Sequence, residues 1–308
     1  MYNIAQNPGD SNVYLHVDGR WYRYDTAACP IGSGAMGTVY MGFSCDTNEP
    51  VAVKLIHPHI CDIPNIRQRA KLEASVRLDC PNVVKMIGYC ENFPDSGPLY
   101  VLSKYISGVT FDEHVCSQLS SLDADDRTAK IVEEFIQILD AVAVLHSNGI
   151  VHRDIKPSNI MLQDGYLPVL MDLGVVKTNY FFDAHICGTV GSQPFAAPEQ
   201  IVPDDVEAKV DSRSDIYSLG MTLSHLISCG NQAGESNCPE TLQSIIERAT
   251  DRNPDGRYPD VWQFREDLES YLHQEEKPSG NALKYCIAGA VALLLLLTLI
   301  FYRYVFTY

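Results

Sequence analysis

The stretch His152-Arg153-Asp154-Ile155-Lys156-Pro157-Ser158-Asn159 places an aspartate and an asparagine five residues apart, with a lysine between them. A carboxylate can orient a hydroxyl group and accept its proton, an amide oxygen can bind a metal ion, and an ammonium group can meet an anionic oxygen. Together these abilities suit phosphoryl transfer, which depends on positioning and on neutralising charge as it spreads. A polar loop with accidental spacing is the alternative interpretation of this stretch alone.

A glycine-rich stretch lies upstream and reads IGSGAMGTV from Ile31 to Val39. Glycines allow backbone amides to approach phosphate oxygens without interference from a Cβ atom. The motif alone is weak, because dinucleotide-binding loops share it. Those loops lead into a helix, however, whereas Thr38-Val39-Tyr40-Met41 is typical of a strand. Lys54, which ends the stretch Val51-Ala52-Val53-Lys54, follows Val39 by fifteen residues.

In this order the motifs resemble those of the eukaryotic-type, or Hanks-type, serine/threonine protein kinases. Residues 31–39 are similar to the G-x-G-x-x-G-x-V loop, residues 51–54 to V-A-I-K, and residues 152–159 to H-R-D-x-x-x-x-N. Asp172-Leu173-Gly174 resembles D-F-G with leucine in place of phenylalanine, and residues 191–199, GSQPFAAPE, resemble the segment that ends in Ala-Pro-Glu. The resemblance implies ATP as substrate and Mg²⁺, or Mn²⁺, as cofactor.

Two features refine the resemblance. Lys156, two residues after Asp154, is typical of the serine/threonine branch rather than of tyrosine kinases. Only about ten polar residues separate Gly230 from Leu242, where the family has a further helix that helps to dock substrates. Expectations about substrate docking therefore do not carry over.

The resemblance assigns a role to each candidate site residue. It implies that Asp154 orients the attacking hydroxyl, that Lys156 neutralises phosphate charge, and that Asn159 and Asp172 hold the metal ion. It assigns ATP binding to Ile31, Gly32, Ser33, Gly34, Ala35, Met36, Gly37, Thr38, Val39, Ala52, Lys54, Glu73, Ser103, Lys104, Ile106 and Met161. Ser103 occupies the gatekeeper position, where a small side chain is expected to leave a back pocket open.

Lys54 is expected to need a carboxylate partner. Glu73 is the only glutamate between Glu49 and Glu91 and lies on a helix predicted over residues 64–78. We therefore expect an ion pair between Lys54 and Glu73. The basic residues of the same helix are expected to be solvated or available to meet phosphate; they are Arg67, Arg69 and Lys71.

The activation segment is expected to run from residue 175 to residue 196. By resemblance, Ser192 bonds the catalytic aspartate and lysine, whereas Thr178 and Thr189 are candidate phosphorylation sites whose phosphate would pair with Arg153. Exposed threonines without any function are an equally simple interpretation. The resemblance also implies two structural features, an ion pair between Glu199 and Arg257 and a buried Asp215 that supports the catalytic loop.

Composition narrows the class of protein further. The chain has 308 residues and a formal net charge of −16, which argues against nucleic acid as a partner, because phosphate backbones require basic surfaces. Ten cysteines are scattered without a CxxC pair. This pattern predicts reduced thiols in a cytosolic domain rather than a disulfide framework or a zinc site.

The resemblance covers roughly residues 25–272 and implies an α+β, bilobal protein-kinase fold. A small β-rich lobe is expected over residues 25–104 and a larger helical lobe over residues 105–272, where apolar residues recur at three- and four-residue steps. Residues 1–24 are expected to form an N-terminal extension with a β-hairpin, because residues 13–25 alternate around Asp18-Gly19.

The C-terminal region predicts a membrane anchor. Residues 273–284 read as a polar linker, residues 285–302 contain no charge and are long enough to span a bilayer, and residues 303–308 form a short tail. A buried core helix is the alternative, but nothing follows that could cover it. A lipid-anchor signal would require an export signal, which residues 1–20 lack.

These observations predict a single-pass membrane protein with a cytoplasmic serine/threonine protein kinase domain that acts on protein substrates and on itself. Among members of the family, the single-pass form is most often seen in bacteria. Small residues at 288, 289 and 292 would allow two membrane helices to pair as a homodimer, although apolar filler explains them more simply. Two alternatives are a membrane-anchored pseudokinase, which binds nucleotide without turnover, and a small-molecule kinase. A lost Lys, Asp or Asn would mark the former, and none is missing.

Overall fold

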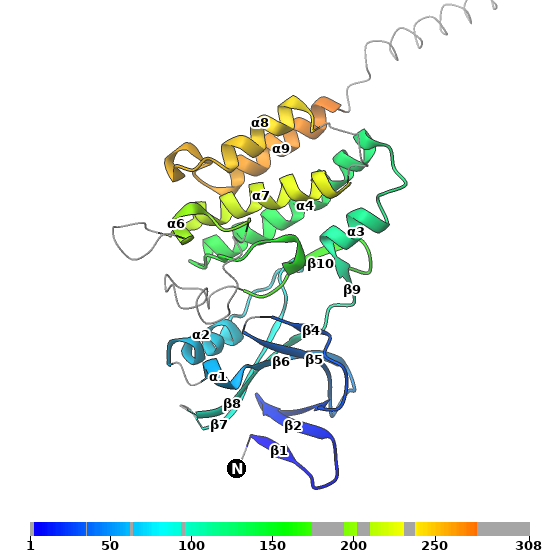
Figure 1. The fold of residues 1–308 in the computed structure, drawn as a ribbon, viewed down its shortest axis with the longest axis vertical. Helices are drawn as coiled ribbons and strands as arrows, with labels where there is room; N and C mark the ends of the chain where they lie inside the picture. The colour runs from blue at the N-terminus through cyan, green and yellow to red at the C-terminus, as the bar shows by residue number, and fades with distance from the viewer. Residues whose placement is uncertain are drawn as a thin grey trace, which may run out of the picture. The chain divides into compact units, whose positions relative to one another are not determined.

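The computed structural model describes residues 3–34, 36–61, 64–93, 96–173, 194–201, 210–230 and 238–275. The chain divides into two compact units, Met1–Leu268 and Glu269–Tyr308. Every residue of the candidate site lies in the first unit. Figure 1 shows the strands of residues 4–104 gathered at one end and helices α4 (Ala124–Ser147), α7 (Ser212–Gly230) and α8 (Glu240–Ala249) at the other, which agrees with the expected bilobal α+β architecture.

One large sheet forms the β-rich lobe. Eight strands pair in the order β1-β2-β3-β5-β6-β8-β7, with β4 beside β5. The bounds of these strands are β1 Ile4–Gln6, β2 Asn12–Val17, β3 Arg20–Asp25, β4 Gly32–Ser33, β5 Gly37–Ser44, β6 Pro50–Ile56, β7 Met86–Phe93 and β8 Ser96–Lys104. Two helices, α1 (Pro58–Cys61) and α2 (Pro64–Ser75), connect β6 to β7.

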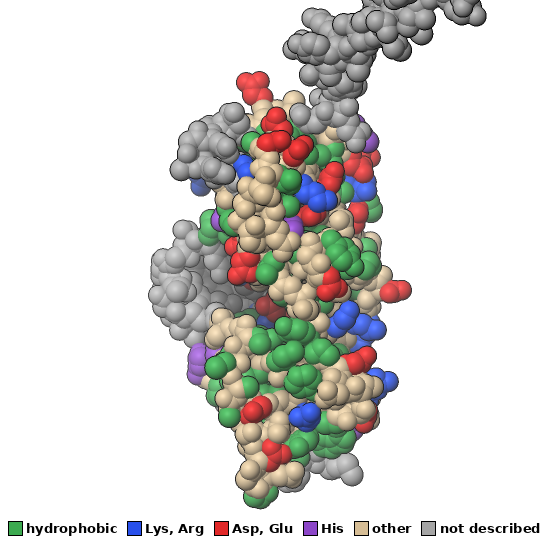
Figure 2. Space-filling model, turned by 90° about the vertical axis from the view of Figure 1, so that its right-hand side faces the viewer, with side chains coloured by type: hydrophobic (Ala, Val, Ile, Leu, Met, Phe, Trp, Pro, Cys, Tyr) green, Lys and Arg blue, Asp and Glu red, His purple; other side chains and the backbone are tan. Residues whose placement is uncertain are grey.

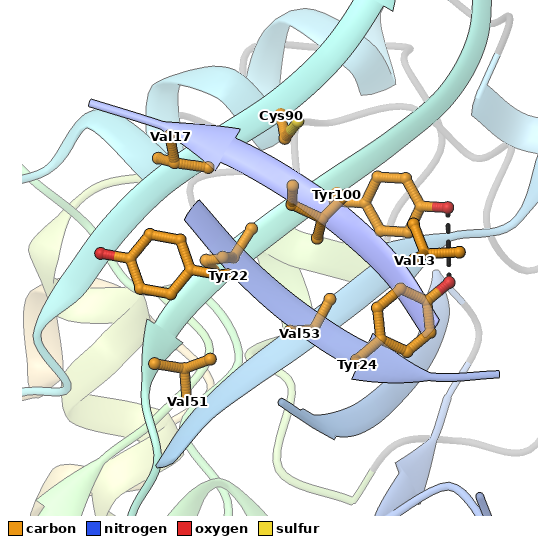
Figure 3. Close-up of a cluster of buried hydrophobic side chains, with 10 residues drawn as sticks. Val13, Val17, Tyr22, Tyr24, Val51, Val53, Cys90 and Tyr100 are labelled. Carbon is orange, nitrogen blue, oxygen red and sulfur yellow. Dashed lines mark hydrogen bonds between the residues drawn. The ribbon is translucent and has the colours of Figure 1, made fainter. Parts of the chain in front are cut away.

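The N-terminal extension is part of this sheet, as its alternating pattern predicts. Asp18 and Gly19 both have positive φ, 47° and 80°, which is the geometry of the tight turn that joins β2 to β3. The inward side chains of this hairpin pack against β6, β7 and β8 in one apolar cluster (Figure 3). Within the cluster the hydroxyl groups of Tyr24 and Tyr100 lie 3.4 Å apart.

The strand β7 begins at Met86 and continues to Phe93, although the apolar stretch before it starts at Val83. Val83 and Val84 are apolar and buried, but their backbone groups pair with the helical lobe rather than with the large sheet. Val83 forms a bridge with Leu170, whose carbonyl oxygen accepts a hydrogen bond from the Val84 amide at 2.9 Å. Tertiary burial, rather than strand pairing, explains the apolar start of this stretch.

The second lobe is mainly helical. Its helices are α3 Phe111–Ser117, α4 Ala124–Ser147, α6 Pro198–Ile201, α7 Ser212–Gly230, α8 Glu240–Ala249 and α9 Val261–Glu275. The α4 helix begins at an aspartate N-cap, Asp123, which accepts a hydrogen bond from the Asp126 amide, and its apolar face is buried. The helical spacing of apolar residues that was expected in this lobe is therefore confirmed for α4.

A small sheet between the helices positions the candidate catalytic residues. It contains β9 (Gly108–Thr110), β10 (Ile160–Gln163) and β11 (Leu167–Leu170) in the order β11-β10-β9. Because β10 and β11 form an antiparallel hairpin, the residues just before β10 and just after β11 lie together. The Met171 amide donates to the carbonyl oxygen of Asn159 at 2.8 Å, so Asp172 leaves the sheet beside Asn159.

No helix within the described part of the chain is long and apolar enough to cross a bilayer. The predicted span, residues 285–302, lies outside the described residues. On the face shown in Figure 2, acidic and basic side chains are interspersed, and no continuous basic surface covers the described residues there.

Candidate active site

Asp215 organises the loop that contains Asp154. It is completely buried at the start of α7, and its carboxylate accepts hydrogen bonds from the amides of His152 and Arg153 at 2.8 and 2.7 Å. His146 lies 2.8 Å from the same carboxylate. Arg153 has a positive φ of 66°, a strained conformation that persists only where its surroundings hold it. The predicted support of the loop by Asp215 is therefore present.

Three candidate catalytic side chains meet on this loop. Lys156 Nζ lies 3.2 Å from the carboxylate of Asp154, and the Asn159 side-chain amide donates to the carbonyl and carboxylate oxygens of Asp154 at 2.8 and 3.0 Å. The 3-10 turn η1 (Pro157–Asn159) makes this short approach possible. The carboxylate of Asp154 is thus fixed in orientation by two neighbours from its own loop.

Lys54 and Asp172 join the two lobes. Lys54 lies on β6 and Asp172 follows β11, yet Lys54 Nζ is 2.7 Å from Asp172 Oδ1. Burial disfavours the charge on Lys54, but the carboxylates of Asp172 and Glu73 outweigh burial and hold the lysine pKa above its ordinary value. Partial burial opposes the charge on Asp172, whose side chain is half exposed, and Lys54 nevertheless lowers its pKa. Both groups therefore remain charged.

The expected partner of Lys54 is close but is not bonded to it. Glu73 is buried on α2, and, among the described residues, no ion pair joins it to Lys54. The lysine pairs with Asp172 instead, so the predicted Lys54–Glu73 ion pair is absent from this structure. Burial raises the pKa of Glu73 to about 7, and the nearby charge of Lys54 limits the rise.

This raised pKa predicts a pH-dependent effect of the substitution Glu73→Gln. A carboxyl group whose pKa rises on folding stabilises the fold below its unfolded value of 4.5, and this contribution is lost as the pH rises to about 7. Because glutamine never ionises, Glu73→Gln should stabilise the nucleotide-free chain more at pH 8 than at pH 4.5, by up to about 3 kcal/mol. Urea unfolding of both proteins at the two pH values measures the difference. An equal effect of the substitution at both pH values would contradict the prediction.

The glycine-rich stretch forms a turn between β4 and β5. Gly32 pairs with Val39 and Ser33 with Thr38, so a strand follows the loop, as predicted. A Cβ atom at Gly37 would collide with the carbonyl oxygen of Leu55 on β6, which explains the need for glycine there. Ile31, an apolar side chain at the entrance to the loop, is 48% exposed.

The candidate adenine-binding residues lie on adjacent strands. Ser103 pairs with Ala52 on one side and with Met86 on the other, whereas Met161 lies on β10 of the second lobe. Lys104, the last residue of β8, is exposed, and Ile106, just beyond the strand, is buried. The assignment of these residues to ATP remains a prediction.

The half-buried Ser103 carries a testable expectation about inhibitors. Replacing it with methionine should fill the space behind the predicted adenine position. ATP-competitive compounds with a bulky group at that point should lose affinity for Ser103→Met by about tenfold or more, while the KM for ATP changes little. Inhibition curves for two compounds that differ only in the bulky group measure this loss of affinity. Equal inhibition of both proteins by the bulky compound would contradict the gatekeeper assignment.

Glu199 and Arg257 form the expected ion pair. Two parallel contacts of 2.7 and 2.9 Å join the guanidinium of Arg257 to the carboxylate, and Ser214 donates a further hydrogen bond to Glu199 at 2.7 Å. The side chain of Arg257 is completely buried. The arginine lowers the pKa of Glu199, although burial opposes this. The pair anchors α6, which follows the expected activation segment.

One expectation about α2 is wrong. Arg67 is buried rather than solvated, and it lies 2.6 Å from Glu91 on β7. Lys71 pairs with the other oxygen of Glu91. Both basic side chains therefore bind α2 to the sheet, and neither is a solvated group of the kind expected from the sequence.

Two residues of the site escaped sequence analysis. His146 contacts Asp215 from the end of α4, and the side chain of Gln200 donates to the carbonyl oxygen of Arg153 at 3.0 Å. Neither belongs to a motif that the sequence analysis used, and only their position in the fold reveals them. Thr178, Thr189 and Ser192 lie outside the described residues, as does Ala35.

The chemistry of Asn159 and Asp172 fits a bound Mg²⁺ ion. Asn159 uses its side-chain amide group on Asp154, and its Oδ1 accepts no hydrogen bond from any residue that the structure describes. Asp172 is half exposed with a positive φ of 46°. An amide oxygen and a carboxylate are oxygen ligands of the kind that Mg²⁺ prefers, and they belong to adjacent segments.

Comparison with known proteins places this site in a family. The model of the protein kinase domain matches residues 26–274. Three curated relatives match most of the chain. The receptor-like kinase LIP2 of Arabidopsis thaliana is 32% identical and covers 76% of the chain. Serine/threonine-protein kinases Pkn1 of Myxococcus xanthus and PknB of Mycobacterium tuberculosis are 28% and 26% identical and cover 82% and 81%.

The match covers 41%, 38% and 43% of these relatives, so the chain spans about two fifths of their length. Among solved structures, the kinase domain of PknI from Mycobacterium tuberculosis superimposes with a TM-score of 0.60 at 21% identity. This superposition covers 86% of the chain and 99% of the PknI domain, which supports the bilobal fold.

Proposed function

Because this chain belongs to the protein kinase family, we propose that it transfers the γ-phosphoryl group of ATP to serine and threonine hydroxyls of proteins. The observation that carries the proposal is the meeting of Lys54 and Asp172 across the two lobes, beside the loop that fixes Asp154. Cationic, metal-binding and proton-accepting groups are thereby gathered in one place, as phosphoryl transfer requires. The serine/threonine names of Pkn1 and PknB support the choice of substrate hydroxyl.

In this proposal each side chain has a defined task. Asp154, oriented by Asn159 and Lys156, accepts a hydrogen bond from the attacking hydroxyl and takes its proton. Lys54 and Lys156 offset the negative charge of the phosphate oxygens. Asn159 and Asp172 would hold Mg²⁺, which neutralises phosphate charge when bound. For Asp172 to hold the metal ion, Lys54 must leave Asp172 and contact phosphate instead. Glu73 is the nearby carboxylate with which Lys54 could then pair.

Incubation of the full chain with radiolabelled ATP, Mg²⁺ and a generic basic protein tests this function. We expect label in phosphoserine and phosphothreonine after acid hydrolysis of the substrate, together with label in the chain itself. Binding of nucleotide without transfer would favour a pseudokinase. Label in a small molecule but in no protein would favour a small-molecule kinase.

We also propose that residues 285–302 anchor the kinase to a membrane with the catalytic lobes in the cytoplasm. The support is the uncharged sequence itself, which Lys284 and Arg303 bracket. Extraction of cell membranes with alkaline carbonate should leave the full chain in the pellet. The double variant Leu294→Arg/Leu296→Arg should be released, because each charge at the centre of a span costs about 2.5–3.5 kcal/mol. Release of the unaltered chain would contradict the anchor.

A further inference from the structure

His57, just after β6, contacts the glycine-rich loop in addition to the β5–β6 strand pairing. Its backbone amide donates to the carbonyl oxygen of Met36 at 2.9 Å. Its ring nitrogen Nε2 lies 3.0 Å from the carbonyl oxygen of Gly34. Two contacts therefore connect His57 to the tip of the loop, one from its backbone amide and one from its side chain.

The contact with Gly34 determines which nitrogen of the His57 ring carries a hydrogen. A carbonyl oxygen can only accept a hydrogen bond, so Nε2 of His57 must carry the hydrogen. The ring of His59 stacks on it, with centroids 5.4 Å apart and an angle of 19° between the planes. Stacking on one side and a hydrogen bond on the other limit rotation of the half-buried His57 ring.

This contact matters because glycine-rich backbone is costly to order. Glycine loses more conformational freedom on folding than any other residue. Within the loop, the Gly34 amide donates to the Gly37 carbonyl at 3.0 Å and the Ile31 amide to Val39 at 2.9 Å. The His57 contacts add an external anchor to these internal bonds.

The anchor also determines which backbone groups of the loop remain available. The carbonyl oxygens of Gly34 and Met36 are occupied by His57, so they cannot turn toward an anionic phosphate, which they would repel. Amide N–H groups are the part of such a loop that attracts phosphate. Because Lys54 lies three residues before His57, the same strand also positions the lysine, which pairs with Val39 across the sheet.

We propose that His57 is a positioning residue that holds the glycine-rich loop ready for the phosphates of a nucleoside triphosphate. The inference rests on the proposed function, since it assumes that the loop covers nucleotide phosphates. His57 acts through Gly34 and Met36 and touches no reacting atom.

Three variants of the full chain separate this role from general stability. His57→Ala removes the ring contact and keeps the backbone contact with Met36. His57→Gln keeps a side-chain N–H donor that can reach toward Gly34. His16→Ala removes an imidazole on β2 that packs against Trp21 and has no described hydrogen bond to residues 31–39, so it serves as the matched control.

The first measurement is nucleotide affinity and turnover. The dissociation constant of a fluorescent ATP analogue with Mg²⁺ should rise about threefold to tenfold in His57→Ala, the size of one hydrogen bond. The KM for ATP should rise in parallel while kcat changes little. His57→Gln should recover most of the affinity, and His16→Ala should leave the affinity unchanged.

The second measurement needs neither nucleotide nor activity. Hydrogen–deuterium exchange of peptides that cover residues 31–39 should be faster in His57→Ala than in the unaltered chain, and close to normal in His57→Gln. Peptides from β10 and α4 should exchange equally in all variants. Unchanged exchange in the loop would overturn the proposal, as would faster exchange throughout both lobes, which would indicate global destabilisation.

The two measurements distinguish failure of this inference from failure of the proposed function. If the unaltered chain binds no nucleotide, the proposed function is wrong, and loop exchange in His57→Ala still decides whether His57 orders the loop. If the unaltered chain binds nucleotide and His57→Ala binds it equally well, only the role of His57 is wrong.

Discussion

Replacing Asp154 with asparagine is expected to lower kcat for phosphoryl transfer by about 10²–10⁴-fold, with little change in the KM for ATP. Asparagine has nearly the same shape, and its carbonyl oxygen can still accept hydrogen bonds from Lys156 and Asn159, which lie 3.2 and 3.0 Å from the present carboxylate. It cannot accept a proton from a substrate hydroxyl. The loop should therefore keep its structure while it loses its base.

Steady-state kinetics with a peptide substrate measures this effect. Asp164→Asn is a matched control, because Asp164 is an exposed aspartate in the turn between β10 and β11, with a φ of 55° that asparagine also adopts readily. It should retain normal kcat. A kcat for Asp154→Asn within a few-fold of the unaltered chain would remove Asp154 from the mechanism.

Replacing Arg257 with methionine is expected to destabilise the fold by about 3–5 kcal/mol, because it leaves the carboxylate of Glu199 without its partner in a buried site. Glu199 is only 9% exposed and Arg257 is not exposed at all. The guanidinium also donates to the carbonyl oxygens of Asp251 and Arg213 at 2.7 and 2.9 Å. Its loss therefore leaves several acceptors unsatisfied at once.

Urea denaturation measures the effect, and two variants provide controls. Glu133→Ala breaks an exposed ion pair with Lys130 and should cost at most about 1 kcal/mol. Adding Glu199→Gln to Arg257→Met should recover part of the lost stability, because the unpaired charge is then gone. A loss below 1 kcal/mol for Arg257→Met would mean that the pair contributes little to the fold.

Local patterns in the sequence predicted much of the fold and several residues of the site. The Asp18-Gly19 turn identified the N-terminal hairpin because few residue pairs adopt two positive φ angles in succession. The spacing between Asp154 and Asn159 indicated that both side chains serve one site, because both lie on one short loop. Glu199 and Arg257 are 58 residues apart, and resemblance to a known family, rather than any local rule, predicted their pairing.

The remaining features depend on tertiary packing, which no local pattern describes. Arg67 lies on a helix with little amphipathic character, so nothing marked it as buried; only the fold brings Glu91 within 2.6 Å of it. The prediction that Glu73 pairs with Lys54 was wrong for a related reason. Both Asp172 and Glu73 lie near the lysine, and the sequence does not determine which of the two carboxylates forms the contact.

His57 illustrates a further limit of sequence patterns. It follows the V-A-I-K-like stretch by three residues and belongs to no motif, yet it contacts Gly34 and Met36 in the glycine-rich loop. The β5–β6 register, in which Gly37 lies opposite Ile56, places the start of the next segment beside the loop tip. Such contacts follow from strand pairing and become visible only when the register is known.

The structure of the chain with Mg²⁺ and a non-hydrolysable ATP analogue tests the central claim most directly, which is that the two lobes form a single site for phosphoryl transfer. We expect phosphates beneath residues 31–39, the metal ion between Asn159 and Asp172, and Lys54 released from its present 2.7 Å contact with Asp172. A complex in which Lys54 still holds Asp172 and the analogue binds elsewhere, or not at all, would contradict the account.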